Sequence, residues 1–362
     1  MNKRHIKNVR AIHEYCHFLK EAKSLCEASV DGITKAINRF EEYTKYKDFK
    51  LFHYQQAVGF KKYLIGQKNV VTDKPLSKAT LHTTMRHLKT FFQYLSMQGN
   101  YKFSIKYSDT EYFNLSNKDT RIATAKRNKP VPKIEQIVQV LEAMPSTTNI
   151  EMRDRALVAF TLLTGARDSA IASVKIKHIC LEDQALNQDA REVNTKYSKT
   201  FTTYFFPVGE LPLKIFTEWF NYLTKELMFS PDDPLFPKTK VKNSSKHKFE
   251  AIGLLKEHWS TAGAIRRVFK QGFKSADLPY FNPHSFRNTL VHLGMDICTD
   301  PKVFKAWSQN LGHQSVLTTF YSYGEVPDYL QAKLLKKLSE PTEEMNPEIL
   351  EGFKKMYAKM MG

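Results

Sequence analysis

The sequence predicts a mainly α-helical protein of two domains with one small β-sheet. Its 362 residues exceed the usual size of a single domain and suffice for two hydrophobic cores. Apolar residues recur at helical spacing through most of the chain, whereas residues 191–208 show the alternation and the β-branched residues of a hairpin. A polar, basic stretch that ends in two prolines, residues 114–132, is typical of a connector between domains.

These features divide the chain into successive parts. They are a basic lead-in (1–20), a helical domain (21–113), the connector (114–132), a second domain that contains the hairpin (133–338) and a terminal helix (339–362). In the helical domain, Ser29 is a candidate cap of one helix, and another helix is expected over about 54–65. The clearest helix follows Ser77, a candidate cap, and ends near Gly99.

The second domain is expected to open with helices over about 133–144 and 150–163. A turn at 197–198 then joins the two arms of the hairpin, 191–196 and 200–208. Residues 230–250 are polar and basic and predict a loop. Further helices are expected over about 212–227, 259–273, 283–295, 303–310 and 327–338.

The charge balance favours a polyanionic partner. Lys and Arg number 55 against 37 Asp and Glu, which gives a net charge of +18. Counterion release would make binding to such a partner strongly salt-dependent. A basic protein that is merely soluble remains the other interpretation of the charge alone.

The cysteines and the apolar runs indicate a cytoplasmic protein. The four cysteines are scattered without a Cys-x-x-Cys pair, so we expect reduced thiols and neither a disulfide framework nor a zinc site. The first twenty residues lack the apolar core of a signal peptide. The most apolar run, residues 156–166, is too short to span a bilayer, so no membrane role is expected.

One stretch near the C-terminus, residues 282–324, concentrates groups that can handle a phosphodiester. It contains His284 and Arg287 three residues apart, then His313 after a glycine, and then two tyrosines. Arg167 follows another glycine far upstream. Two guanidinium groups can hold the non-bridging oxygens of a phosphodiester, and histidines nearby can hydrogen-bond the phosphate or move protons. A tyrosine hydroxyl can attack phosphorus and form a covalent intermediate, a reaction that needs no metal.

Three separated sequence blocks carry a resemblance to a known family. They are Thr-Gly-Ala-Arg at 164–167, His-Ser-Phe-Arg at 284–287, and Leu-Gly-His at 311–313, which is followed by two threonines and tyrosine. Together and in this order, they resemble the tyrosine recombinases of the phage integrase family over roughly residues 20–335. The resemblance implies a helical, SAM-like core-binding domain followed by a mixed α/β catalytic domain. It also implies a DNA strand transferase that uses neither ATP nor a metal cofactor.

The resemblance assigns roles to the grouped residues. Arg167 and Arg287 would clamp the scissile phosphate, and His284 and His313 would assist by hydrogen bonding and proton transfer. A lysine at the hairpin tip would protonate the leaving 5′ oxygen. Lys196 aligns best with that position and Lys199 is the second choice, although both could be ordinary exposed turn lysines.

The nucleophile is less directly assigned. The commonest family spacing places a tyrosine nine residues past His313, where this chain has Ser322, flanked by Tyr321 and Tyr323. The sequence Ser-Tyr-Gly resembles a subgroup that keeps the tyrosine before the glycine. We therefore expect Tyr323 to attack and give a 3′-phosphotyrosine, with Tyr321 as the reserve.

The chain departs from the family at one further position. Many members carry an acidic residue three positions after the first arginine, which orients that arginine. This chain has Ala170 there, so Asp168 or a residue from another segment would have to orient Arg167, unless nothing does.

Basic and hydroxyl side chains suggest where DNA would be contacted. The predicted contacts in the helical domain, the connector and the second domain are Lys78, Thr83, Arg86, Lys89, Lys126, Arg127, Lys129, Lys199, Arg266 and Arg267. The alternative for the residues in each of these three parts is that they are ordinary solvent-exposed side chains that do not contact DNA.

The expected partners are double-stranded DNA, other copies of the chain in a tetramer on DNA, and a directionality factor. The terminal helix would dock on a neighbouring protomer or on its own domain. The expected function is site-specific recombination that integrates or excises a mobile element. A type IB topoisomerase and a catalytically inactive DNA-binding factor remain as alternatives.

Overall fold

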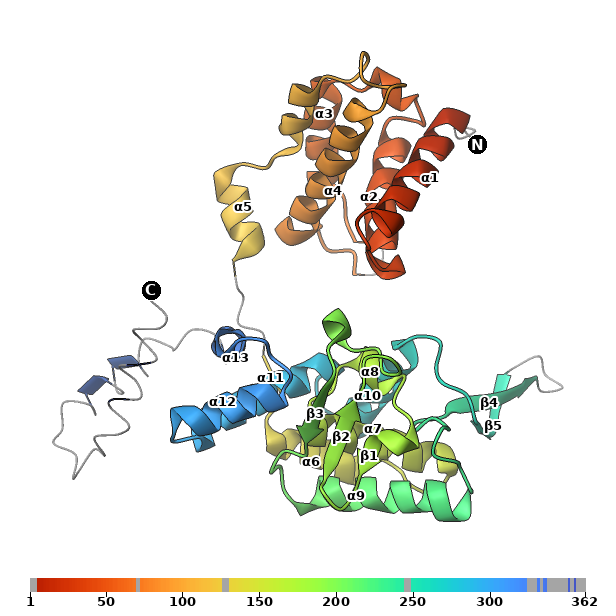
Figure 1. The fold of residues 1–362 in the computed structure, drawn as a ribbon, viewed down its shortest axis with the longest axis vertical. Coiled ribbons are helices and arrows are strands. Elements are labelled where there is room, and N and C mark those ends of the chain that lie inside the picture. Colours follow the sequence, from red (N-terminus) through yellow and green to blue (C-terminus); the bar gives the residue numbers. More distant parts are fainter. Residues whose placement is uncertain are drawn as a thin grey trace. The chain divides into compact units, whose positions relative to one another are not determined.

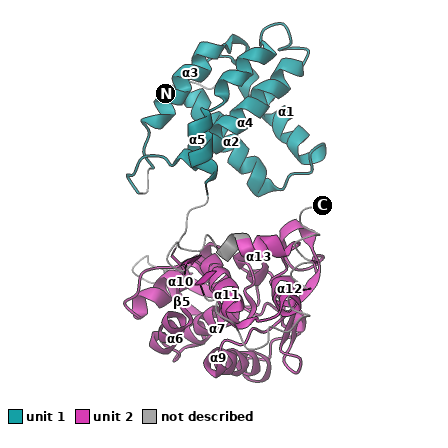
Figure 2. Ribbon diagram, turned by 90° about the vertical axis from the view of Figure 1, so that its left-hand side faces the viewer, with its two compact units in different colours: residues 1–127 teal, residues 128–362 magenta. Residues whose placement is uncertain are grey.

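The chain forms two compact units, Met1–Arg127 (unit 1) and Asn128–Gly362 (unit 2), shown in different colours in Figure 2. The computed structural model describes residues 5–69, 72–125, 130–243, 249–323 and, further on, 331–332, 335–336, 351 and 355. For residues 243, 249 and 321–323 it describes the backbone. No helix in these described ranges is long and apolar enough to cross a membrane.

Unit 1 is helical, and its apolar faces meet in one core. Its helices are α1 (Ile6–Glu21), α2 (Glu27–Tyr43), α3 (Tyr54–Ile65), α4 (Lys78–Met97) and α5 (Asn117–Thr124), with 3₁₀ turns at Phe49–Leu51 and Tyr107–Phe113 (Figure 1). The ring of Phe40 meets those of Phe60 and Phe92 edge to face, with centroids 5.2 Å apart in both pairs. Tyr15 and Leu19 of α1 are buried in the same core. Helix α1 is therefore part of the unit, although the sequence indicated only a lead-in at 1–20.

The helix ends of unit 1 follow local capping chemistry. Ser77 caps α4 as predicted, since its hydroxyl accepts a hydrogen bond from the backbone N–H of Thr80 at 3.2 Å. Ser29 is not the cap of α2, because the helix begins at Glu27 with Cys26 in the capping position. The helix expected over 54–65 has those bounds.

Part of the expected connector is helical. Ser116 starts α5 by accepting a hydrogen bond from the backbone N–H of Asp119 at 3.0 Å. Asp119 in turn forms an ion pair with Lys78 of α4 at 2.7 Å, so α5 is held against α4. At the far end of the connector, the carbonyl of Pro132 accepts a 2.6 Å hydrogen bond from the buried Thr289 of unit 2.

Unit 2 is built around the buried helix α7. Its helices are α6 (Ile134–Ala143), α7 (Asn149–Thr164), α8 (Asp168–Ile171), α9 (Glu210–Asn221), α10 (Gly263–Ser275), α11 (Pro283–Ile297), α12 (Pro301–Asn310) and α13 (Val316–Tyr323), with a 3₁₀ turn at Ile176–His178 and a π-helical turn at Tyr222–Glu226. Every residue of α7 from Ala156 to Thr164 is buried, as expected for its long apolar run. Thr148 and Glu151 form a capping box at its start.

A small antiparallel sheet precedes α9. Its strands are β1 (Ile179–Cys180), β2 (Ala185–Gln188) and β3 (Phe201–Tyr204), in the order β1-β2-β3. The predicted first arm, 191–196, is wrong, because β2 pairs with β3 and residues 189–200 form the loop between them. The strand ends where the Asp189 carboxylate accepts a 2.9 Å hydrogen bond from the backbone N–H of Arg191, which turns the chain.

The predicted loop at 230–250 is also wrong in part. Residues Lys238–Asn243 (β4) and Phe249–Leu255 (β5) pair as an antiparallel hairpin that extends outward from unit 2 (Figure 1). The buried Arg153 of α7 holds its base, donating to the carbonyl of Pro237 at 2.8 Å and to the Thr239 hydroxyl at 2.9 Å. The alternating lysines of β4 hid the strand, because they resemble the charge of a solvated loop.

Gly165 is expected to be intolerant of a side chain. Its φ is +57°, and an added Cβ would lie 2.9 Å from the Leu290 side chain and 3.0 Å from that of Leu311. Gly165→Ala should therefore lower the free energy of unfolding of unit 2 by about 2 kcal/mol. Urea unfolding followed by tryptophan fluorescence measures this, since all three tryptophans lie in unit 2.

Gly263→Ala is the matched control for that substitution. Gly263 has no positive φ, and the nearest atom to its added Cβ is the Thr261 hydroxyl at 3.3 Å. Equal effects of the two substitutions would contradict the strain assigned to Gly165.

Candidate active site

Arg167 heads a helix directly after the turn that ends α7. Gly165 caps α7 in the left-handed conformation, and Arg167 occupies the capping position of α8 with its side chain half-buried. This is the placement that the Gly165 turn predicted. Burial lowers the pKa of Arg167, while the nearby phenol of Tyr197 acts in the opposite direction.

Arg287 connects the three sequence blocks. It lies in the first turns of α11, is 4% exposed and donates one hydrogen bond to the carbonyl of Gly165 at 2.9 Å. Its second terminal nitrogen donates to the carbonyl of Leu311. Gly165 belongs to the sequence block that contains Arg167, and Leu311 belongs to the block that contains His313. Burial, and then the positive charge of Arg167, lower the pKa of Arg287.

His284 lies one turn before Arg287 on α11, because Pro283 begins the helix. Desolvation of the ring by the surrounding protein, and then the charges of Arg287 and Arg167, lower the pKa of His284. A cavity of about 400 Å³ opens beside it. The lining residues are Arg167, Asp168, Arg266, Asn282, Pro283 and His284.

His313 follows the left-handed Gly312, whose φ is +68°. Its side chain is 8% exposed, and its Nδ1 lies 2.7 Å from the hydroxyl of Thr319. Burial, and then the charges of Arg287 and Arg167, lower the pKa of His313 to about 3. The imidazole is therefore neutral at physiological pH.

The four predicted residues Arg167, His284, Arg287 and His313 thus share one region of unit 2. Each of the two histidines has its pKa lowered by both arginines. The arrangement is a cluster of positive and neutral groups, which is suited to an anionic ligand.

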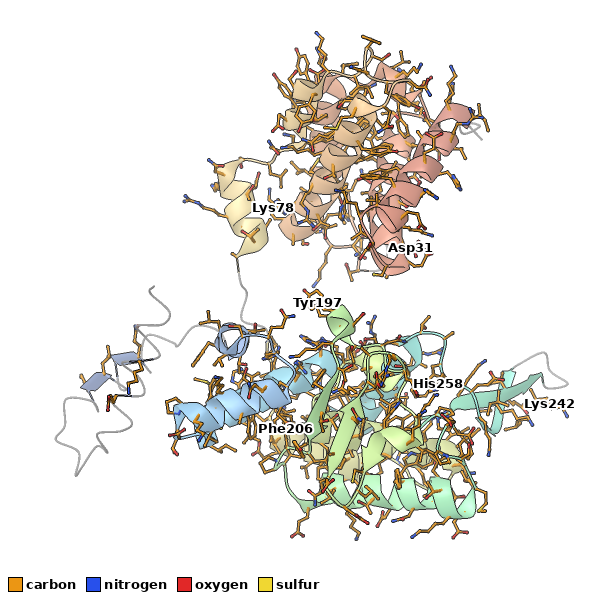
Figure 3. The ribbon with its side chains drawn as sticks, in the orientation of Figure 1. Asp31, Lys78, Tyr197, Phe206, Lys242 and His258 are labelled. Carbon is orange, nitrogen blue, oxygen red and sulfur yellow. The ribbon has the colours of Figure 1, made fainter. Side chains whose placement is uncertain are left out.

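The two predicted lysines lie on the loop between β2 and β3. Lys196 begins the exposed 3₁₀ turn Lys196–Ser198, and its ammonium lies 4.7 Å from the centre of the Tyr197 ring, at the tip of the loop (Figure 3). Its charge contributes to the lowered pKa of His284. Lys199 is half-buried, with its ammonium 5.6 Å from the Phe201 ring, and contributes to the lowered pKa of His313. Both lysines therefore act electrostatically on the cluster.

Asp168 does not orient Arg167, although the sequence suggested it as one of the open choices. Its carboxylate accepts hydrogen bonds from the side chain of Arg266 on α10, at 3.0 and 2.8 Å. Within the described ranges, Arg167 makes no ion pair with a carboxylate. Arg266, predicted to contact DNA, is thus held beside Arg167 at the mouth of the cavity, while its exposed neighbour Arg267 lines a separate cavity.

A family model described as the phage integrase family matches residues 132–326. The chain belongs to this family. The resemblance found in the sequence is confirmed, and with it the predicted enzyme class, a tyrosine-type site-specific DNA recombinase. A similar curated relative is the tyrosine recombinase XerC of Treponema denticola, which is 24% identical over 316 residues, 84% of this chain and 90% of that protein.

Two solved integrase structures are similar in fold. A lambda integrase tetramer bound to a Holliday junction has a TM-score of 0.53 at 12% identity, covering 88% of this chain and 78% of that one. The Tn1549 transposon integrase in complex with transposon right end DNA has a TM-score of 0.52 at 14% identity, covering 91% and 99%. These likenesses confirm the predicted fold class, a mainly α-helical protein with a helical N-terminal domain and a mixed α/β domain.

The two candidate nucleophiles of this integrase-family chain, Tyr321 and Tyr323, lie at the end of α13, after the residues that bury the helix. Thr319 is fully buried, and the ring of Phe320 packs on Phe304 with centroids 5.0 Å apart. Tyr321 and Tyr323 occupy the last turn, where the backbone is described. The predicted connector residues Lys126, Arg127 and Lys129 lie outside the described residues.

In unit 1, two predicted DNA contacts are already paired on the α5 side of α4. Lys78, seen in Figure 3, binds Asp119, and Lys89 donates to Glu111 at 2.7 Å and to Asn114 at 3.1 Å. Arg86 lines the cavity on that same side.

Thr83 instead lines a basic cavity between α2 and α4 of about 390 Å³. Lys35 and Arg39 of α2 also line this cavity, and sequence reasoning missed them. Their four-residue spacing was the available signal.

No group of three or more His, Cys, Asp or Glu side chains within the described ranges is placed to hold a metal ion. The four cysteines are free thiols in the structure.

His313 should make the stability of unit 2 depend on pH. The unfolded histidine titrates near 6.5 and the folded one near 3, so below pH 6.5 the unfolded state takes up a proton that the folded state does not. The free energy of unfolding then falls with decreasing pH, by up to about 1.4 kcal/mol per unit. We expect wild type to lose about 2 kcal/mol more than His313→Asn between pH 7 and pH 5, measured by urea unfolding. Parallel losses in the two proteins would contradict the lowered pKa.

Proposed function

We propose that the protein cleaves and rejoins DNA strands at specific sites through a covalent 3′-phosphotyrosine intermediate. The observation that carries this proposal is the convergence on Arg287. Its hydrogen bonds to the Gly165 and Leu311 carbonyls bring Arg167, His284 and His313 into one cluster. A scissile phosphodiester would place an anion against the positive charges of this cluster.

Arg167 and Arg287 act as the clamp on the phosphate. A guanidinium carries five N–H donors, and the contacts of Arg287 to carbonyls use two of them. The remaining donors can bind non-bridging oxygens and stabilise the charge that develops in the transition state. His284 and His313 assist by hydrogen bonding and proton transfer, and Lys196 protonates the leaving 5′ oxygen.

Tyr323 is the nucleophile in this proposal, and the helix geometry of α13 supports it. Thr319 is buried and contacts His313, so its face of α13 is turned toward the cluster. In an α-helix, residue 323 lies about 40° from residue 319, whereas residue 321 lies about 200° away. Tyr321 instead follows Leu317 by one turn, and Leu317 is 37% exposed.

Double-stranded DNA is the proposed partner, with unit 1 as the core-type DNA-binding domain and unit 2 as the catalytic domain. The net charge of +18 and the basic cavity between α2 and α4 support this. A tetramer on DNA is proposed because the similar lambda integrase forms one on a Holliday junction. Integration or excision of a mobile element, with a directionality factor, fits the transposon integrase of similar fold.

The terminal segment, residues 339–362, is proposed to dock on a neighbouring protomer. An apolar cavity of about 780 Å³ at α11, α12 and α13 supports such docking. Lys355 of the same chain also lines this cavity, so docking within one protomer is the alternative.

Tyr323→Phe should abolish a denaturation-resistant protein–DNA adduct on a nicked duplex that carries the target site. The phenol oxygen forms the bond to phosphorus, and phenylalanine lacks it. Tyr321→Phe is the matched control and should retain the adduct. Gel electrophoresis under denaturing conditions measures both.

The outcomes separate the open functions. Loss of the adduct in Tyr321→Phe but not in Tyr323→Phe would overturn the nucleophile and leave the function. Absence of an adduct from wild type would indicate a DNA-binding factor without catalysis. Relaxation of single-site supercoiled plasmids without joining of two sites would indicate a topoisomerase.

Arg39→Gln should weaken DNA binding more than Lys89→Gln does. Arg39 lines the open cavity with Thr83, whereas the Lys89 ammonium is already paired with Glu111. Loss of one phosphate contact should reduce the slope of log affinity against log salt by about 1. Fluorescence anisotropy with a labelled duplex at several salt concentrations measures the slope. Equal losses for both variants would contradict the assignment of this face.

A further inference from the structure

Thr319 links His313 to a second buried hydroxyl. Its oxygen lies 2.7 Å from Nδ1 of His313, and its hydroxyl donates a hydrogen bond to the Ser308 oxygen at 2.7 Å. Thr319 and Ser308 are 0% and 1% exposed. A buried chain of hydrogen bonds therefore runs from His313 through α13 to α12.

The direction of these hydrogen bonds determines the tautomer of His313. A threonine hydroxyl has one hydrogen, and here that hydrogen is donated to Ser308. The Thr319 oxygen must then accept from His313, so the proton of the imidazole lies on Nδ1. A neutral imidazole carries one N–H, which leaves a lone pair on Nε2.

We infer that Thr319 is a positioning residue that holds His313 with Nε2 ready to accept a proton in strand cleavage. This inference rests on the proposed function, in which His313 faces the scissile phosphate. The other groups that act on the ring are Arg287, Arg167, His284 and Lys199. The arginines and the lysine cannot accept the Nδ1 proton, and the Thr319 oxygen is the atom that lies within hydrogen-bond distance of Nδ1.

In cleavage, each change of a bond to phosphorus is accompanied by a proton transfer. As the Tyr323 oxygen bonds to phosphorus, the phenol loses its proton to Nε2, and His313 becomes an imidazolium. The bond from phosphorus to the 5′ oxygen breaks, and that oxygen takes a proton from Lys196. In the reverse step, the 5′ hydroxyl returns its proton to Lys196, and His313 returns its proton to the phenol. The opposite tautomer, with a proton on Nε2, could not accept in the first step.

Thr319, which orients His313, lies on the same helix as the proposed nucleophile Tyr323. Residues 319 and 323 are one turn apart on α13, so the hydroxyl that orients His313 and the proposed nucleophile belong to the same helix. Movement of α13 would then displace both groups together.

The test compares four variants. Thr319→Val removes the hydroxyl and keeps the shape, and Thr319→Ser retains the hydroxyl. Ser308→Ala removes the acceptor, so that the Thr319 hydroxyl is released to donate to Nδ1. Thr318→Val is the matched control, because it makes the same chemical change at an exposed position of α13.

Nitrogen NMR of the imidazole groups in the free protein reads the tautomer directly, and His313→Asn assigns the signal of His313. Wild type, Thr319→Ser and Thr318→Val should carry the proton on Nδ1. Thr319→Val and Ser308→Ala should shift it toward Nε2. A purely structural role of Thr319 would leave the tautomer unchanged.

Single-turnover cleavage of a nicked duplex gives the second measurement. Thr319→Val should cleave about 10–100-fold more slowly, as expected when the hydrogen-bond partner of a functional histidine is lost, with DNA affinity unchanged. Thr319→Ser and Thr318→Val should cleave like wild type. Should Thr319→Val fail to fold, as judged by thermal melting, the tautomer and cleavage rate of Ser308→Ala decide.

Two failures are distinguishable. A wild-type adduct together with an unchanged tautomer and rate in Thr319→Val, or in Ser308→Ala where the former does not fold, overturns this inference alone. A wild-type protein that forms no adduct overturns the proposed function and the positioning role with it.

Discussion

The buried guanidinium of Arg287 is the contact on which the candidate site depends. Moving a charge out of water costs several kcal/mol unless hydrogen bonds replace the lost hydration. Here the replacements are the carbonyls of Gly165, 122 residues earlier, and of Leu311, 24 residues later. Within the described ranges no carboxylate pairs with Arg287, so its charge is hydrogen-bonded but not neutralised. The fold therefore buries a cation whose charge acts on His284 and His313, and an anionic ligand would compensate it.

Two left-handed glycines make these carbonyls available. Gly165 and Gly312 have φ values of +57° and +68°, which an L side chain rarely adopts. The first precedes Arg167 by two residues, and the second directly precedes His313. A Cβ on Gly312 would lie 2.5 Å from the ring of Phe201, so β3 packs against this turn. The loop that carries Lys196 and Lys199 leads into β3 and is thereby fixed to the cluster.

The sequence predicted the grouped residues better than the elements around them. Arg167, His284, Arg287 and His313 could be found because phosphodiester chemistry admits few residue types, and their order was informative. The first hairpin arm was missed because the Asp189 side chain ends β2, a local contact that alternation does not encode. Lys35 and Arg39 were missed because they line a basic cavity only when α2 lies beside α4. The pairing of Asp168 with Arg266 spans 98 residues and has no sequence signal.

The alanine at position 170 then has an electrostatic consequence. Its side chain is buried, 1% exposed, in the core of unit 2, so a carboxylate there would be desolvated as well as close to Arg167. Without it, and with Asp168 committed to Arg266, Arg167 remains uncompensated by a carboxylate within the described ranges. Burial first, and then the charges of the two arginines, lower the pKa of each neighbouring histidine. In the proposed function, a phosphodiester monoanion would oppose the arginines' contribution, since its charge offsets theirs and raises the proton affinity of the imidazoles. The departure from the family pattern thus leaves the charge of Arg167 to add to the burial that lowers both histidine pKa values, an effect that a phosphodiester would oppose in the proposed function.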